Sequence, residues 1–197
     1  MEIKNLLNTM RLAENLKNNT RHSWTSTGRH ESVAEHSWRL TVMAYFMQDE
    51  FPEADINKVI QMCMFHDIGE AFTGDIPCFE KSQKNEDVEA DCVMNWIQSL
   101  PAPYQTKLLE LYQEMEAQET LEAKLYKALD KLEVVIQHNE ADLSTWIELE
   151  YTLNLTHGSK EVEFSNYLKS LREEIKEESL KKIEQDGANI SNPNKIV

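Results

Sequence analysis

Apolar residues recur at intervals of three and four along most of the chain, the spacing that places them on one face of a helix. The first such segment, at about 2–17, has Leu6, Leu7, Met10 and Ala13 on one face. The pattern predicts further helices at about 32–50, 56–72 and 84–99, from Pro101 or Pro103, and at about 119–141, 143–155 and 160–184. No strand pattern persists. We therefore predict one all-α domain of about six to eight helices over residues 1–185, followed by a flexible tail at 186–197.

Polar residues mark the ends of several predicted helices. Ser32 and Glu35 have the Ser-x-x-Glu spacing of a capping box, and Asp55 can cap the next helix. Gly74 stands just past that helix, where a C-terminal glycine is common. Residues 18–30 are polar and lack helical spacing, so we interpret them as a loop.

Composition agrees with a helical domain and excludes some partners. Glycine and proline number 5 each in 197 residues, which is few for the tight turns of an all-β or α/β fold. With 41% apolar and 28% charged residues, the chain can bury a core. The formal net charge is −15, without a basic cluster, which disfavours nucleic-acid binding because Lys and Arg must neutralise phosphates. No apolar run reaches the roughly 18 residues of a membrane span.

The N-terminal segment and the cysteines favour the cytoplasm. The first residues lack a continuous apolar stretch and carry Glu2 and Glu14, unlike a signal or transit peptide. Cys63, Cys78 and Cys92 form no Cys-x-x-Cys pair, so we expect reduced, intracellular thiols.

Two predicted helices carry histidines on their apolar faces. His36 lies in line with Val33 and Leu40, either as a core histidine bonded to a carbonyl or as a ligand. His66 ends another apolar stripe, with Asp67 beside it and Glu70 one turn further on. Such groups are costly to bury unless they are paired or bind a metal. About 0.3 His-Asp dipeptides are expected by chance in this composition, so the dipeptide alone is weak support.

A third candidate is Asp130, at the edge of the apolar stripe of helix 119–141. It is either a ligand or a solvated carboxylate paired with Lys127 or Lys131. The remaining histidines are expected in the 18–30 loop (His22, His30) or at the surface (His138, His157). Taken together, His36, His66, Asp67 and Asp130 form a mixed nitrogen and oxygen set. Such a set suits one divalent ion of Mn, Fe, Co, Ni or Zn, and Mg less well.

The order His … His-Asp … Asp in a helical domain resembles the HD phosphohydrolase superfamily, and most closely its 5′-deoxynucleotidase branch. The matching segments are TRHSWTSTGRHESVAEHSWRL, MFHDIGEAFTGDIP and EAKLYKALDKLEVVIQ. Within them, HDxxExxxGD is far more specific than the HD pair. His22 and Ser23 separate Arg21 from Trp24. In the bacterial nucleotidases the aromatic residue follows the arginine directly. The eukaryotic-type relatives have the same spacing as this chain.

The resemblance implies a role for each matching residue. The metal ligands would be His36, His66, Asp67 and Asp130, with Glu70 and Asp75 as catalytic carboxylates and Arg21 and Trp24 facing a nucleotide. It implies a metal-dependent 5′-nucleotidase acting on (deoxy)nucleoside 5′-monophosphates, and a homodimer. From the residues alone, Arg21 can instead pair with a surface acid, and Trp24 can fill the edge of the core.

Two other functions stay open on the sequence. One is an HD hydrolase acting on a triphosphate, (p)ppGpp or a cyclic dinucleotide; the missing second His-rich motif, GYP and HD-ED patterns count against the last two. The other is a non-catalytic protein that retains a metal, against which the intact Glu70 and Asp75 argue. The dimer surface could include Trp96, Tyr104, Tyr112 and Trp146, which are otherwise core residues.

Overall fold

The computed structural model describes residues 1–77 and 79–185, so the predicted tail at 186–197 and Cys78 lie outside the described residues. The chain is predominantly helical, which confirms the predicted fold class. The helices and strands are α1 Ile3–Asn18, β1 Thr20–Trp24, β2 His30–Ser32, α2 Val33–Tyr45, α3 Ile56–Phe65, α4 Glu70–Thr73, α5 Gln83–Ser99, α6 Ala102–Ala117, α7 Leu121–Glu140, the 3₁₀ turn η1 Leu143–Thr145, α8 Glu150–Leu153 and α9 Asn166–Gln185.

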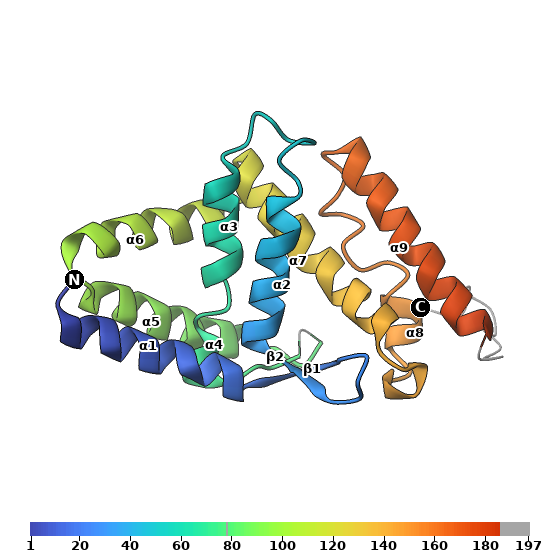
Figure 1. The fold of residues 1–197 in the computed structure, drawn as a ribbon, viewed down its shortest axis with the longest axis horizontal. Helices are drawn as coiled ribbons and strands as arrows, with labels where there is room; N and C mark the ends of the chain where they lie inside the picture. The colour runs from blue at the N-terminus through green and yellow to red at the C-terminus, as the bar shows by residue number, and fades with distance from the viewer. Residues whose placement is uncertain (78, 186–197) are drawn as a thin grey trace.

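Helix α7 runs through the middle of the molecule (Figure 1). Helices α2 and α3 pack against it and against each other, and α9 packs on its other side. Helices α1, α4, α5 and α6 form the end of the molecule that lies farthest from α9. Within the described ranges, no helix combines the length and apolar character needed to cross a bilayer.

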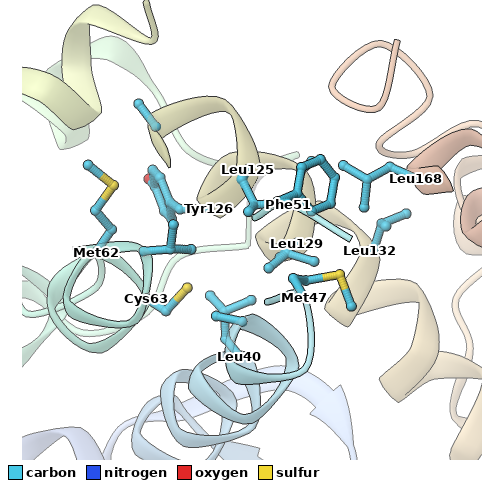
Figure 2. Packing of buried hydrophobic residues seen from close by; sticks show 14 of the residues in the cluster. Leu40, Met47, Phe51, Met62, Cys63, Leu125, Tyr126, Leu129, Leu132 and Leu168 are labelled. Atoms are coloured by element: carbon cyan, nitrogen blue, oxygen red, sulfur yellow. The ribbon is translucent and has the colours of Figure 1, made fainter. Parts of the chain in front are cut away.

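The main core lies between α2, α3 and α7, and Figure 2 shows its packing. Leu40, Leu129 and Leu132 are fully buried there, and Leu168 of α9 closes it from one side. Leu129 and Leu132 are three residues apart on α7, so both lie on the face that this helix turns toward the core. The polar site described below lies against this core, which holds its three helices in fixed positions.

The predicted helix starts are confirmed. Ser32 accepts from the backbone N–H of Glu35, while the Glu35 side chain accepts from the backbone N–H of Ser32. The Asp55 side chain accepts from the N–H of Lys58. Because these bonds join residues three apart, the sequence alone could reveal them.

The expectation of a plain loop at 18–30 is wrong. Strands β1 and β2 form a short antiparallel hairpin, with Thr20 opposite Ser32 and Trp24 opposite His30. Gly28 has a φ of +78°, a conformation that suits glycine at the turn. The hairpin packs on α7, with the Trp24 carbonyl accepting from Gln137 Nε2 at 2.7 Å. This support comes from a distant part of the chain, so local hydrophobic spacing does not predict it.

The predicted helix at 56–72 is also interrupted. Helix α3 ends at Phe65, residues 66–69 form turns, and α4 begins at Glu70. The hydroxyl of Tyr112 donates to the Phe65 carbonyl, and the Ile68 N–H bonds to that same carbonyl at 3.1 Å. Gly69 lies so close to α5 that a Cβ there would stand 2.4 Å from Cγ of Glu89. The break turns the residues after Phe65 toward the candidate site.

The four candidate interface aromatics are distributed between core and surface. Trp146 is buried and donates from Nε1 to the His138 carbonyl at 2.9 Å. Tyr112 and Trp96 are half-buried against the core clusters, whereas Tyr104 is exposed.

Candidate active site

Four side chains from three parts of the fold converge beside the main core. His36 comes from the buried face of α2, His66 and Asp67 from the break after α3, and Asp130 from α7. The Nε2 atoms of the two histidines lie 3.3 Å apart. Asp130 Oδ1 lies 3.3 Å from the His36 Nε2 atom and 3.6 Å from that of His66. Asp67 Oδ2 lies 3.0 Å from His66 Nε2 and 3.8 Å from His36 Nε2.

These distances fit a divalent ion. Metal–ligand bonds of about 2.0–2.2 Å place neighbouring donors roughly 3.0–3.5 Å apart. The His36, His66 and Asp67 donors all lie within 4.8 Å of one another, and Asp130 approaches both imidazoles from α7. Two imidazoles and two carboxylates suit a transition metal better than Mg²⁺.

The electrostatics of the cluster also favour a cation at its centre. Burial lowers the pKa of His66, but the carboxylates of Asp67 and Asp130 outweigh burial and raise it to about 10. Burial raises the pKa of Asp67, but the His66 imidazolium outweighs it and holds this pKa well below its usual range. The carboxylates therefore stabilise positive charge on the imidazoles, and a metal cation can take the place of those protons.

The Nδ1 atoms of His36 and His66, which point away from the centre of the cluster, form hydrogen bonds with other protein groups. The Nδ1 atom of His36 donates to Glu133 Oε2 at 2.5 Å, and that of His66 donates to the Cys63 carbonyl at 2.9 Å. Both Nε2 atoms therefore face the centre with a free lone pair when the rings are neutral. Glu133 is fully buried, with Arg39 Nε at 3.6 Å and Arg21 at 3.7 Å.

Glu133 is not among the residues predicted from the sequence. The available signal was a glutamate one helical turn after Asp130, within a segment whose neighbours are apolar.

Glu70 and Asp75 lie beside the cluster, on the cleft side. Glu70 is 5% exposed, and its Oε2 atom has no hydrogen-bond partner among the described residues. Burial, reinforced by the nearby Asp67 and Asp75 carboxylates, raises the pKa of Glu70 to about 9. Burial also raises the pKa of Asp75, against the opposing effect of Arg21. At neutral pH the site therefore holds a protonated carboxyl group on Glu70.

A cleft with a volume of about 330 Å³ opens over this cluster. Its lining includes basic side chains: Arg21, Lys81, Lys127 and Lys131. Lys127 and Lys131 lie 3.3 Å and 3.4 Å from Oδ2 of Asp130, so the expected pairing with lysines is present. The carboxylate is only 7% exposed, however, and is not solvated as that alternative assumed. The lining also carries acidic side chains: Asp67, Glu70, Asp75, Glu86, Glu89, Asp130 and Glu150. A divalent ion at the cluster would therefore add the positive charge that an anion needs in a chain with a net charge of −15.

Of the two residues expected to face a nucleotide, the structure places one in the cleft. Arg21 lines it and forms an ion pair with the buried Glu31 at 3.2 Å. Trp24 lies outside the described cleft lining, and its ring packs on His30 with 3.9 Å between centroids. Trp24 is at the end of β1 and lies opposite His30 across the hairpin, on which its ring packs.

The surface expectation for two histidines is wrong. His138 is only 6% exposed, His157 is half-buried, and both line the cleft, as does His22 from the hairpin. Glu150 and Asn154, which follow α7 in the chain, contact the His138 ring, so only the tertiary structure reveals its burial.

Comparison with known proteins shows to which family and folds the chain is similar. A sequence profile described as the HD domain matches residues 13–172. The protein named 5′-deoxynucleotidase HDDC2 of Bos taurus is 34% identical over 145 residues, which cover 70% of this chain and 68% of that protein. A predicted metal-dependent phosphohydrolase from Magnetospirillum magnetotacticum MS-1 superposes with a TM-score of 0.73 at 25% identity, over 90% of this chain and 94% of that one. A conserved hypothetical protein from Pyrococcus furiosus superposes with a TM-score of 0.68 at 31% identity, over 89% and 99%.

Proposed function

The chain belongs to the HD-domain family, and on that premise we propose that it is a metal-dependent phosphohydrolase that removes phosphate from nucleoside 5′-monophosphates, above all the 2′-deoxy forms. The observation that carries the proposal is the convergence of His36, His66, Asp67 and Asp130 beside Glu70 in a cleft lined by basic side chains. The name of the Bos taurus relative supports the choice of substrate.

We propose that these two histidines and two aspartates hold one divalent ion, with Co, Mn, Ni, Fe, Zn and Mg as the candidates. When bound, the ion would act as a Lewis acid and polarise a phosphoryl oxygen. Arg21 and Lys127 lie on the cleft wall and can donate to the remaining phosphate oxygens.

The protein's own carboxyl groups divide the proton transfers. The protonated Glu70 is placed to give its proton to the 5′ oxygen of the nucleoside as the phosphorus–oxygen bond breaks. Asp75 is placed to accept a proton from the attacking water, which forms the new phosphorus–oxygen bond. The products are inorganic phosphate and a nucleoside, and the two carboxyl groups exchange their protonation states.

A direct contact between Trp24 and the sugar stays a prediction. The indole supports the hairpin that carries Arg21, and a contact with substrate requires it to leave His30. Comparing kcat/KM for matched 2′-deoxy and ribo monophosphates, in the parent and in Trp24→Ala, tests this contact. Equal sugar preference in the two proteins would contradict it.

We also propose a cytoplasmic homodimer. Helix α2 exposes Trp38 and its end exposes Tyr45 and Phe46, with exposed fractions of 68%, 59% and 69%. Clustered aromatics at a surface are typical of protein contacts. Within residues 1–77 and 79–185, Cys63 and Cys92 form no disulfide, as suits a reducing compartment.

The test of the main proposal is phosphate release from matched substrates. The purified protein is supplied in turn with each candidate metal and with a deoxynucleoside monophosphate, a ribonucleoside monophosphate, a deoxynucleoside triphosphate and a cyclic dinucleotide. We expect release from the monophosphates, lost in Asp67→Ala and kept in Asp49→Ala, which changes an exposed aspartate away from the cleft. No release from any monophosphate, with metal bound, would overturn the proposal in favour of the other HD chemistries.

A further inference from the structure

The cleft extends beyond the candidate metal ligands toward a second group of polar side chains. His138 follows Asp130 by eight residues on α7, and both line the cleft. Two helical turns and a fraction separate their backbones by about 12 Å at 1.5 Å per residue. A phosphate placed at the aspartate therefore leaves room for the rest of a nucleotide along α7.

Glu150 contacts two histidines of this second group, His22 and His138. Its Oε1 atom lies 3.2 Å from His22 Nε2 and 3.4 Å from His138 Nε2, and its Oε2 atom accepts from the Ile147 N–H at 2.9 Å. The Glu150 side chain is only 2% exposed. Burying a carboxylate costs free energy unless other groups pair with it. The carboxylate thus fixes the position of the His22 ring at the cleft wall.

A hydrogen-bond donor near Glu150 has no partner among the described residues. The Asn154 side chain is 1% exposed and lines the cleft. Its Oδ1 atom faces His138 Nδ1 at 2.9 Å, while its Nδ2 atom has no hydrogen-bond partner within residues 1–77 and 79–185. Buried donors are rarely left unpaired, so the Asn154 amide nitrogen indicates a ligand at this end of the cleft.

An aromatic corner completes this end. The rings of His22 and Phe79 lie 5.7 Å apart between centroids at an angle of 88°, and both residues line the cleft. Their side chains remain partly open, with 29% exposure for His22 and 39% for Phe79. A flat heterocycle stacked on one ring would present its edge to the other.

We propose that His22, Phe79 and Asn154, with Glu150 as the positioning residue, form the subsite that binds the nucleobase. The inference rests on the proposed function, because the metal cluster determines where the phosphate lies. Stacking on His22 or Phe79 binds the face of the base, and the Asn154 amide can donate to its edge.

The test compares a substrate with a base and one without. In the parent protein, kcat/KM is measured for dAMP and for 2-deoxyribose 5-phosphate. In His22→Ala and Phe79→Ala, we expect the ratio of the two values to fall about 5- to 150-fold, the range that stacking on one aromatic ring contributes. Activity on 2-deoxyribose 5-phosphate should stay unchanged, which also shows that the variant is folded. Phe164→Ala is the matched control, because Phe164 is also 39% exposed and lies outside the cleft lining.

Either of two results would overturn the inference. One is an unchanged ratio in both variants, and the other is an equal loss for both substrates in Phe79→Ala, whose ring is 39% exposed. Binding of deoxyadenosine, which has no phosphate, separates this failure from failure of the proposed function. If the parent releases no phosphate yet binds deoxyadenosine and His22→Ala does not, the subsite stands and the phosphatase proposal fails. If neither protein binds deoxyadenosine and the ratio is unchanged, the subsite fails.

Discussion

Replacing Glu70 with glutamine should change how the stability of the protein depends on pH. The substitution keeps the size of the side chain and removes its ionisable proton. Glu70 is 5% exposed, and burial, with the carboxylates of Asp67 and Asp75, raises its pKa from 4.5 to about 9. The glutamine variant carries no such group, so it should lose the part of the pH dependence that Glu70 causes.

The direction and size follow from proton linkage. Below pH 4.5 the carboxyl group is protonated in both the folded and the unfolded chain, and it makes no difference to stability. Between pH 4.5 and about 9 the unfolded chain releases the proton while the folded chain keeps it, so stability falls as pH rises. Each pH unit in this window lowers the free energy of unfolding by about 1.4 kcal/mol. From pH 5.5 to 7.5, the parent should lose about 2.7 kcal/mol relative to Glu70→Gln.

Urea unfolding of both proteins at pH 5.5, 6.5 and 7.5, with a chelator to remove divalent ions, measures this difference. Using the change between pH values cancels any constant cost of placing an amide at the site. Glu86→Gln, at an exposed position on the same cleft, is the control and should give a curve parallel to that of the parent. Parallel curves for the parent and Glu70→Gln would refute the claim that Glu70 is buried with its proton.

Four further predictions concern the metal ligands, their support, the acid and the core. Asp67→Ala should lose bound metal by elemental analysis, and unchanged occupancy would count against a ligand role. Glu133→Gln should weaken metal affinity about 10- to 100-fold in a chelator competition, because the amide no longer holds His36 as a carboxylate does. Glu70→Ala should keep the metal while kcat falls about 10²- to 10⁴-fold; loss of metal would make Glu70 a ligand instead. Leu129→Ala, at a fully buried position, should cost about 2–5 kcal/mol in urea unfolding, and a cost under about 1 kcal/mol would contradict the packing of α7.

The sequence by itself determined what depends on neighbours within a turn or two. Helical spacing of apolar residues predicted the elements, and the Ser32–Glu35 capping box predicted the start of α2. The same spacing placed His36 and Asp130 on or beside buried faces, so their candidacy as ligands could be stated before their distance was known. These predictions work because a helix brings residues three and four apart together whatever surrounds it.

Only the tertiary structure decided the features that depend on distant contacts. The hydroxyl of Tyr112, on α6, donates a hydrogen bond to the Phe65 carbonyl. This bond contributes to the break that turns His66 toward His36. The Glu133 carboxylate supports His36 across 97 residues of sequence. Glu150 joins His22 to His138 from the segment that folds back after α7. Each of these groups is polar and would look like a surface residue in the sequence, because burial and pairing become visible only when separate segments meet.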